Sequence, residues 1–527
     1  MQYDIAVIGA GFSGSLFAMI ARRLGHSVVL IEKGVHPRVV IGESSTPLAN
    51  LLLEELCTRY NFDALKPLTK WGSWQRVHPE IACGLKRGFT FHYHVLGSPA
   101  RHDPNRRDQL LVTASPRNDI ADMHWYRADF DYFLLREAQK LGVEYFERTA
   151  LHEFADDGRE VRLGGERDGR AVEFHVRFAV DASGPRGFLH RVLGLREAEL
   201  PGIPATQSLY NHFTGVRRLD ETSHGRTDEE PPYPIDDAAV HHVFDGGWVW
   251  VLRFNSGVTS AGVAATDALA QRLKLSEGAP AWSRLLTLIP ALNDQFADAK
   301  PERGFAYLPR LAFRAASAAG ERWAMLPSAA GFVDPLLSTG FPLTLLGVSR
   351  LTEIIERDWN TERFSTKLLG YAAQTDRELL ATSRLIGALY ENMHNFNVFV
   401  ALTLLYFAAA GFSEAALRLG RPQLAPSFLL CTHPKFGLKC EQLCALAMQK
   451  PTADAARLLV TEILAAIEPF NVAGLGRRER RNWYPVEAED LLNASSKLGA
   501  TRNEVQALLE RCGFVCAPSG AIAQTPA

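Results

Sequence analysis

The first thirty residues of the chain contain two short apolar runs separated by a glycine cluster. Residues 4–8 read Asp-Ile-Ala-Val-Ile and lead directly into Gly9-Ala10-Gly11-Phe12-Ser13-Gly14. An apolar, helix-favouring stretch follows to Leu24, and a second apolar run at 27–31 ends at Glu32. This order of strand, glycine turn, helix, strand and acid predicts a βαβ unit.

The glycine cluster has the spacing of a dinucleotide-binding turn. Gly9, Gly11 and Gly14 permit a tight turn and let the backbone approach a diphosphate at the start of the helix, where N–H groups and the helix dipole favour anions. Glu32 follows the last glycine by eighteen residues and is placed to accept a hydrogen bond from a ribose hydroxyl. The sequence therefore predicts that a dinucleotide binds here.

Farther along the chain the pattern changes twice. From Leu200 to Arg314 apolar and polar residues alternate in short strands, interrupted at 220–237 by a charged, proline-rich loop that we expect to be mobile. Together with a strand segment around residues 84–95, this block predicts a separate antiparallel sheet. From about Arg377 apolar residues recur at helical spacing. The apolar stretch Phe396–Phe412 is short for a membrane span, so we expect a buried helix there.

Composition adds few constraints. The chain has 527 residues, 47% hydrophobic and 22% charged, which is typical of a globular enzyme with two or three structural units. A net charge of −2 favours neither nucleic acid nor stable membrane association. The seven cysteines lack the spacing of a zinc site, and no basic leader precedes the first strand. We expect a cytoplasmic protein with reduced thiols and no bound metal.

Lys86 is a candidate for chemistry. It lies in a run from Cys83 to Phe91 that we interpret as one strand, and alternation places it on the face of Gly84, Gly88 and Thr90. Leu85, Phe89 and Phe91 would then occupy the opposite face. A lysine that faces into a protein is costly unless it is paired, so an inward Lys86 is a functional candidate, whereas an outward one is an ordinary solvated lysine.

Other candidates each have a plain structural reading as well. Arg127 opens a predicted helix to about Gln139, with Asp129 or Asp131 in a capping position; its guanidinium suits a phosphate or a surface ion pair. Trp248 and Trp250 point the same way on a strand, which also suits packing in a sheet core. Thr46-Pro47 and Asp334-Pro335 are each typical of the start of a helix.

The spacing Lys86-x-Gly88-x-Thr90-Phe91 and the Trp248/Trp250 pair resemble the flavin-dependent halogenases. The segments 172–184 and 323–335 resemble elements of the hydroxybenzoate-hydroxylase-type flavoproteins, which implies FAD rather than NAD. The ordered motifs extend from residue 1 to about 375. They are most similar to members that act on free phenolic rings, notably around 82–86 and 241–244.

The resemblance implies a role for each matching position. The lysine at position 86 would hold hypohalous acid or form a chloramine, Trp248 and Trp250 would shield the flavin, and Ser338, Thr339 and Gly340 would bind chloride or bromide. Two positions depart from the family: Arg253 stands where it has proline, and Leu337 where tryptophan-specific members have glutamate. The second departure favours a phenol, because its hydroxyl activates the ring. Contacts to FAD are implied for Gly9, Gly11, Phe12, Ser13, Gly14, Glu32, Lys33, Glu43, Ser44, Ser45, Arg127, Asp334 and Gly340.

The predicted fold class is α/β: a Rossmann-type FAD-binding domain, an antiparallel β-sheet substrate domain and a C-terminal helical region. The FAD-binding domain would comprise residues 1–75, 120–195 and 315–376, and the sheet domain residues 76–119 and 196–314. The helical region would cover 377–515, followed by a flexible tail at 516–527.

The predicted function is halogenation of a small, electron-rich, phenolic substrate with reduced FAD, oxygen and chloride or bromide. No second nucleotide motif is visible, which fits a separate flavin reductase as a transient partner. Three alternatives stay open: an FAD-dependent aromatic hydroxylase that uses NAD(P)H, a flavin-dependent reductase or dehydrogenase acting on lipid-like substrates, and a flavin-binding assembly partner that has lost catalysis.

Overall fold

The computed structural model describes residues 1–99, 103–222, 224–225 and 229–514. The predicted tail at 516–527 lies outside them, as do residues 223 and 226–228 of the predicted mobile loop. The helices are α1 (Phe12–Arg23), α2 (Pro47–Arg59), α3 (Trp71–Val77), α4 (Arg127–Lys140), α5 (Phe188–Val192), α6 (Asp267–Leu273), α7 (Ala279–Leu288), α8 (Pro290–Gln295), α9 (Pro327–Ala330), α10 (Gly340–Asp358), α11 (Arg363–Glu391), α12 (Phe396–Arg418), α13 (Phe436–Ala447), α14 (Ala453–Ile467), α15 (Ala488–Asn493) and α16 (Arg502–Arg511).

A seven-stranded sheet contains the nucleotide-binding motif. Its order is β7-β2-β1-β10-β9-β8, with β18 beside β10. The strands β1, β2, β7, the end of β10 and β18 are parallel, and all four residues of β2 are buried, as expected for a strand covered on both faces. The predicted βαβ unit is therefore confirmed. The bounds are β1 (Gln2–Ile8), β2 (Val28–Ile31), β7 (Glu144–Phe146), β8 (Thr149–Asp156), β9 (Val161–Arg167), β10 (Arg170–Asp181) and β18 (Trp323–Met325).

A nine-stranded sheet forms the second layer, in the order β15-β11-β14-β13-β12-β4-β5-β20 with β16 beside β11. Most neighbours are antiparallel as predicted, but β4 and β12 pair in parallel, as do β5 and β20. β20 comes from the C-terminal region, which is therefore not purely helical. The bounds are β4 (Gly88–His94), β5 (Gln109–Thr113), β11 (Thr206–Thr214), β12 (Ala239–Phe244), β13 (Gly247–Arg253), β14 (Thr259–Thr266), β15 (Lys300–Pro301), β16 (Ala306–Leu308) and β20 (Trp483–Tyr484).

The expected single strand from Cys83 to Phe91 is wrong. The chain forms two strands there: β3 (Cys83–Lys86) pairs with β6 (Asp122–Trp125), and β4 belongs to the nine-stranded sheet. Since Arg87 separates the two strands, alternation does not continue across it, and the aromatic ring of Phe89 lies against Lys86 instead of on an opposite face. A further pair joins β17 (Phe313–Arg314) to β19 (Gly331–Phe332).

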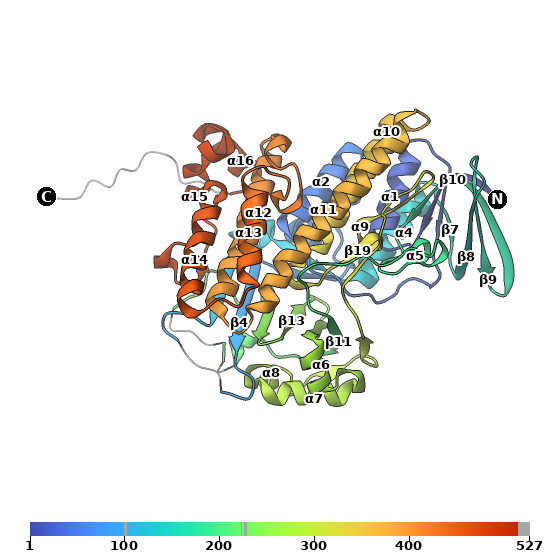
Figure 1. Ribbon diagram of the computed structural model, residues 1–527. Helices are drawn as coiled ribbons and strands as arrows, with labels where there is room; N and C mark the ends of the chain where they lie inside the picture. Colours follow the sequence, from blue (N-terminus) through green and yellow to red (C-terminus); the bar gives the residue numbers. More distant parts are fainter. Residues whose placement is uncertain (100–102, 223, 226–228, 515–527) are drawn as a thin grey trace.

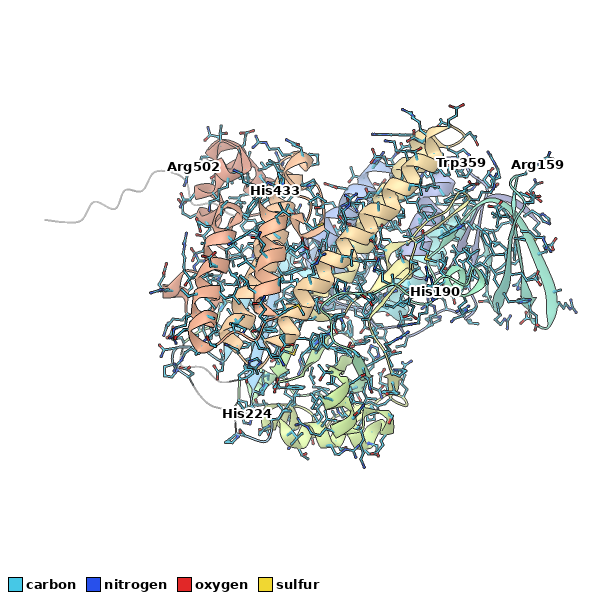
Figure 2. The ribbon with its side chains drawn as sticks, viewed as in Figure 1. Arg159, His190, His224, Trp359, His433 and Arg502 are labelled. Carbon is cyan, nitrogen blue, oxygen red and sulfur yellow. The ribbon has the colours of Figure 1, made fainter. Side chains whose placement is uncertain are left out.

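The C-terminal half supplies long helices. Figure 1 shows α10 and α11 crossing the middle of the molecule, with α12 to α16 gathered on the side away from β8 and β9. In Figure 2, His433 and Arg502 mark the helical end and Arg159 marks the opposite end, at the turn between β8 and β9. Helix α12 has the length and composition of a membrane span, with a mean hydropathy of 1.8, but 78% of that stretch is buried inside the protein. The predicted buried helix is thus confirmed, whereas the division into domains stays a prediction.

Candidate functional site

The glycine turn between β1 and α1 forms a cradle with two guanidinium groups around it. Gly9 has a φ of +103°, in the region that glycine adopts without strain. A Cβ placed on Gly11 would lie 3.4 Å from Arg38 Nη2 and 3.5 Å from Arg127 Nη2. Because this turn also ends at the N-terminus of α1, backbone N–H groups and two guanidinium groups lie around one point, with Asp131 Oδ2 3.6 Å from it. The residues present thus fit a dinucleotide diphosphate.

Glu32, at the end of β2, is buried and held by the backbone of the same turn. Its Oε2 accepts from the Ala10 N–H at 3.0 Å, and its Oε1 accepts from the Gly34 N–H at 2.9 Å. Burial by itself would raise the pKa of this carboxyl, but the charge of Arg38 and these N–H groups outweigh it and lower the pKa. Glu32 therefore stays ionised beside the turn. Lys33, also expected to contact FAD, is exposed.

Arg127 begins helix α4 as predicted; its contact with a phosphate stays a prediction, whereas a surface ion pair does not agree with its burial. Its guanidinium is buried and makes a two-pronged ion pair with Asp131, at 2.7 and 2.8 Å, while Nη1 donates to Gly42 O at 3.0 Å. It is therefore no surface ion pair. The expected cap at Asp129 or Asp131 is wrong, because the N-cap residue is Tyr126 without a side-chain bond and Asp129 accepts from the Ala82 N–H instead.

Phe12, in the first turn of α1, connects the cradle to helix α10. Its ring packs edge-on against Phe341 at 5.0 Å, and the Arg127 guanidinium lies over it at 4.9 Å. Ser13 is buried in the same turn. The structure thus brings the predicted nucleotide contacts to the start of α10, where Gly340 is exposed and a Cβ would meet no atom within 4 Å.

Asp334 does not start an α-helix directly. Pro335 leads into a 3₁₀ turn at Leu336–Ser338, in which Leu337 and Ser338 have φ values of 64° and 55°, and α10 begins only at Gly340. Asp334 Oδ1 accepts from the Leu336 N–H at 2.9 Å, and Tyr390 donates to Oδ2 at 2.9 Å. Burial raises the pKa of Asp334 to about 7, although these donors oppose the rise. Thr339, the N-cap residue of α10, is buried.

The two tryptophans of β13 are both buried and share one face, as predicted. Their rings lie 5.6 Å apart, and Trp248 Nε1 donates towards Asp334 Oδ1 at 3.3 Å and Tyr390 Oη at 3.1 Å. Tyr390, on α11, was missed by the sequence analysis because nothing near it in the chain marks it. Trp250 Nε1 reaches Ser260 Oγ at 3.3 Å. The tryptophan pair is thus part of a polar network that includes the predicted cofactor aspartate.

Lys86 is fully buried, so the inward reading of this residue is confirmed. Its Nζ donates to Ser44 Oγ at 2.8 Å and to Ser45 O at 2.5 Å, and it lies 3.8 Å from the centre of the Phe89 ring. Burial lowers the pKa of this ammonium, and the charge of Asp122 partly opposes that shift. Segment Gly42–Thr46 runs from the cradle to Lys86, since Gly42 binds Arg127 and Ser44 binds Lys86. Within it, Glu43 binds His212 at 2.9 Å in a buried pair.

A cavity of about 220 Å³ lies next to Lys86. Its walls include Thr46, Asn50, Phe89 and Asp122, together with residues from α12 and α16, among them Tyr406, Phe407 and Leu508. Among the described residues its lining does not include Lys86, which lies behind Phe89 and Asp122. Asn50, Asp122 and the helical wall were missed in the sequence, because they become neighbours only through the fold. The volume exceeds the roughly 150 Å³ that holds a benzene ring in an engineered cavity.

Comparison with known families agrees with this geometry. The model of the tryptophan halogenase family matches residues 121–397, about half of the chain. Monodechloroaminopyrrolnitrin halogenase PrnC from Pseudomonas fluorescens is 29% identical over 385 residues, which is 72% of this chain and 66% of that protein. Tetracycline 7-halogenase from Kitasatospora aureofaciens is 29% identical over 389 residues, 72% of this chain and 68% of that protein. The match thus spans just under two thirds of PrnC.

Solved structures show the same fold. The crystal structure of halogenase PltM superposes with a TM-score of 0.80 at 24% identity and covers 91% of this chain and 99% of its own. The structure of PltM in complex with phloroglucinol and FAD gives a TM-score of 0.78 at 23% identity, with 92% and 100% covered. This likeness confirms the predicted fold class with its Rossmann-type FAD-binding part.

Proposed function

We propose, from the premise that this chain belongs to the tryptophan halogenase family of flavin-dependent halogenases, that it halogenates an electron-rich, phenol-like ring. Enzymes of this family use FAD and a halide. The reaction would consume reduced FAD, oxygen and chloride or bromide. The single observation that carries the proposal is the fully buried Lys86 ammonium behind Phe89 and Asp122, two residues that line a cavity of about 220 Å³.

Lys86 has the surroundings that holding an oxidant requires. A buried ammonium is costly, and within the described part of the chain the Lys86 ammonium donates hydrogen bonds only to the Ser44 hydroxyl and the Ser45 carbonyl. Protonated, it would donate a hydrogen bond to hypohalous acid and keep it away from water. Its place between the segment Gly42–Thr46 and the cavity puts such a species between the cofactor side and the substrate side.

The halide would bind at the start of α10. Ser338, Thr339 and Gly340 form the turn there, and helix α10 has 19 residues, so its N-terminus favours an anion. The left-handed φ values of Leu337 and Ser338 turn the backbone at that point. Gly340 leaves open space in which a halide would have room beside the cofactor site.

FAD would lie along the cradle. Gly9, Gly11 and Gly14, with Ser13, Phe12 and Arg127, would hold the diphosphate, and Glu32 a ribose hydroxyl. Asp334 and the segment Glu43–Ser45 would hold the part near the ring, and Lys33 would contact the cofactor only at its exposed edge. When bound in its reduced form, FAD supplies the electrons with which oxygen oxidises the halide. Trp248 and Trp250 would exclude other reactants from it.

A separate flavin reductase would supply reduced FAD, as is general in this family. No second nucleotide cradle is needed for that arrangement. A reducing, cytoplasmic location is part of the proposal and is supported by the six cysteines of the described residues, all of which are free.

The residue at position 337, a leucine, supports the proposal of a phenolic substrate. Leu337 is buried and apolar, so it offers no proton acceptor at the place where tryptophan-specific members have glutamate. A phenol needs less help there, because its own hydroxyl donates electrons to the attacked carbon. PrnC and tetracycline 7-halogenase, to which this chain is similar, are named for substrates other than free tryptophan.

The test is mass spectrometry of a mixture of resorcinol, simple phenols and free tryptophan, incubated with the protein, FAD, a flavin reductase, NADH and bromide. We expect brominated phenols in at least about tenfold excess over brominated tryptophan, a difference of about 1.4 kcal/mol in transition-state binding. Hydroxylated products that form equally without bromide would establish the aromatic hydroxylase instead. Preferential bromination of tryptophan would refute the phenolic substrate while leaving the halogenase in place.

A further inference from the structure

One carboxylate in the wall of the cavity has an oxygen without a partner. Asp122 lies on β6 and is only 6% exposed. Its Oδ1 accepts from Asn50 Nδ2 at 2.7 Å, whereas its Oδ2 is buried and has no hydrogen-bond partner among the described residues. A buried carboxylate oxygen left unpaired costs free energy, and such a cost in a ligand-sized cavity is typical of a site that a ligand completes.

The other carboxylates of the same cavity are already paired. Glu414 forms an ion pair with Arg418 at 2.8 Å, and Glu487 forms one with Arg480 at 2.9 Å. Within the described part of the chain, Asp122 is therefore the cavity carboxylate with a free acceptor site.

Asp122 also stands directly across from Lys86. The two residues are register partners in the antiparallel pair of β3 and β6, so their side chains leave the same face of that pair. Their charged ends nevertheless make no direct ion pair among the described residues; Lys86 turns to Ser44 and Ser45, and Asp122 to Asn50. A substrate in the cavity would thus meet an acceptor at Asp122 close to the group that holds the oxidant.

The orientation of Asp122 is fixed by a short chain of hydrogen bonds. Ser45 Oγ donates to Asn50 Oδ1 at 2.8 Å, which leaves the amide of Asn50 to donate to Asp122 Oδ1. Ser45 binds Lys86 through its carbonyl, so one segment holds both partners of the pair. Such support engages Oδ1, so Oδ2 is the carboxylate oxygen that has no hydrogen-bond partner among the described residues.

We propose that Asp122 is a catalytic residue of this halogenation and accepts the hydroxyl proton of the phenolic ring. The inference rests on the proposed function and adds to it a residue and a substrate preference: a ring that carries an O–H or N–H group should react faster than one that carries neither. That group binds Asp122 Oδ2, and this contact directs a neighbouring ring carbon towards Lys86.

The step balances as follows. The halogen–oxygen bond of hypohalous acid breaks as a carbon–halogen bond forms, and the phenol O–H proton moves to Asp122 Oδ2. The hydroxide released takes the proton from the halogenated ring carbon and becomes water. Asp122 returns its proton to the ring oxygen, so the sum is one ring C–H and one hypohalous acid converted to one C–halogen bond and one water.

The charged groups around Asp122 set its titration. Burial raises the pKa of this carboxyl, Glu414 raises it further, and Asn50, Lys86 and Arg418 oppose the rise. A carboxyl with a raised pKa is a better proton acceptor than an ordinary one. Because it must be ionised to accept, the rate with a phenol should fall as pH decreases, and should do so at a higher pH than for an exposed aspartate.

The experiment compares Asp122→Asn with the wild-type enzyme on two probes, resorcinol and resorcinol dimethyl ether, with FAD, a reductase and bromide. We expect kcat/KM for resorcinol to fall by about 100-fold, the scale of general base catalysis, and the ether, which has no proton to give, to change by less than about threefold. Asp129→Asn replaces a half-buried carboxylate that accepts a hydrogen bond from the Ala82 backbone, and it should leave both rates unchanged.

The outcomes distinguish failure of the proposed function from failure of the proposed role of Asp122. If the wild-type enzyme brominates neither probe, the proposed function fails. If it brominates both and Asp122→Asn slows them equally, or slows neither, the role of Asp122 is refuted while the halogenase stands. Should Asp122→Asn fail to fold, Asn50→Ala serves instead: it removes a donor that lowers the pKa of Asp122, so the acid limb for resorcinol should move to higher pH and that for the ether should not. An unmoved limb for resorcinol would also refute the role.

Discussion

The cradle around Gly11 and the cavity beside Lys86 lie at the two ends of one segment, Gly42–Thr46. Backbone groups form most of the cradle, whereas side chains form the cavity wall. In the cradle the turn is tight, and its backbone N–H groups and the N-terminus of α1 face one point, where an anion would bind. In the cavity wall, side chains from β4, β6, α2 and α12 supply the contacts. The first region depends on the space that its glycines leave open, whereas the second depends on charge and hydrogen bonding.

The largest expected effect is on the cavity side. Lys86→Met removes the ammonium and keeps an apolar side chain of similar length, so we expect bromination of a phenol to fall by about 1000-fold, within the range of a group that takes part in proton transfer. FAD binding, measured by flavin absorbance after gel filtration, should be unchanged, because Lys86 lies outside the cradle.

Lys66→Met provides the control for this variant, since Lys66 is a surface lysine paired with Asp63 and should be replaceable without loss of activity. Melting temperature gives an independent check. Because the substitution removes a positive charge that stabilises the buried Asp122 carboxylate, Lys86→Met should melt below the wild-type protein but still fold. Full bromination by a folded Lys86→Met protein would remove the lysine from the mechanism.

The cradle should respond differently, through loss of the cofactor. Gly11 has an ordinary φ of −73°, so Gly11→Val is compatible with the backbone, but its branched side chain would fill the space between the guanidinium groups of Arg38 and Arg127. We expect FAD affinity to fall by about 100-fold, or about 2.8 kcal/mol, in a protein that still folds. Isothermal titration with FAD and circular dichroism would measure the two effects.

Gly14→Ala is the matched comparison within the same turn. A Cβ on Gly14 would lie 1.9 Å from Gly9 O, which no small adjustment relieves. We therefore expect this smaller substitution to prevent folding, whereas the larger one at Gly11 leaves a folded apoprotein. A yellow holoprotein with one FAD per chain from Gly11→Val would contradict the assignment of the cradle.

The two regions also differ in how much of them the sequence predicts. The βαβ unit and Glu32 follow from local spacing, because a backbone turn needs particular residue types at adjacent positions. Asn50, Asp122 and Tyr390 have no such spacing. They meet Lys86 or Asp334 only after strand pairing and helix packing bring distant segments together. The chain changes from β3 to β4 at Arg87, and these two strands belong to different sheets. The alternation of side chains predicts a shared face only within one strand, so it fails across Arg87.

The smallest expected effect on the reaction concerns Arg253, the departure from the family pattern that lies outside both regions. Its guanidinium binds Asp236 Oδ1 at 3.0 Å and Val216 O at 3.0 Å, and does not line the cavity. The Asp236 side chain is fully buried, so Arg253→Ala leaves a buried carboxylate without its cation and should cost about 3 kcal/mol of unfolding free energy. Arg217→Ala, which removes an exposed pair with Asp298, should cost less than about 1 kcal/mol.

The loss in Arg253→Ala should depend on pH in a definite direction. Burial already raises the pKa of Asp236 despite Arg253, so the unfolded state releases this proton more readily than the folded state, and stability falls as pH rises through the folded pKa. Without Arg253 that pKa rises further, which enlarges the loss at neutral pH. At a pH below the ordinary aspartate pKa both states are protonated and the difference should shrink. Urea unfolding at neutral and acidic pH measures this, while the ratio of brominated to hydroxylated product should stay that of the wild-type enzyme. A ratio shifted towards hydroxylation would mean that Arg253 influences the reaction at the flavin. It would then be wrong to place Arg253 outside both the cradle and the cavity.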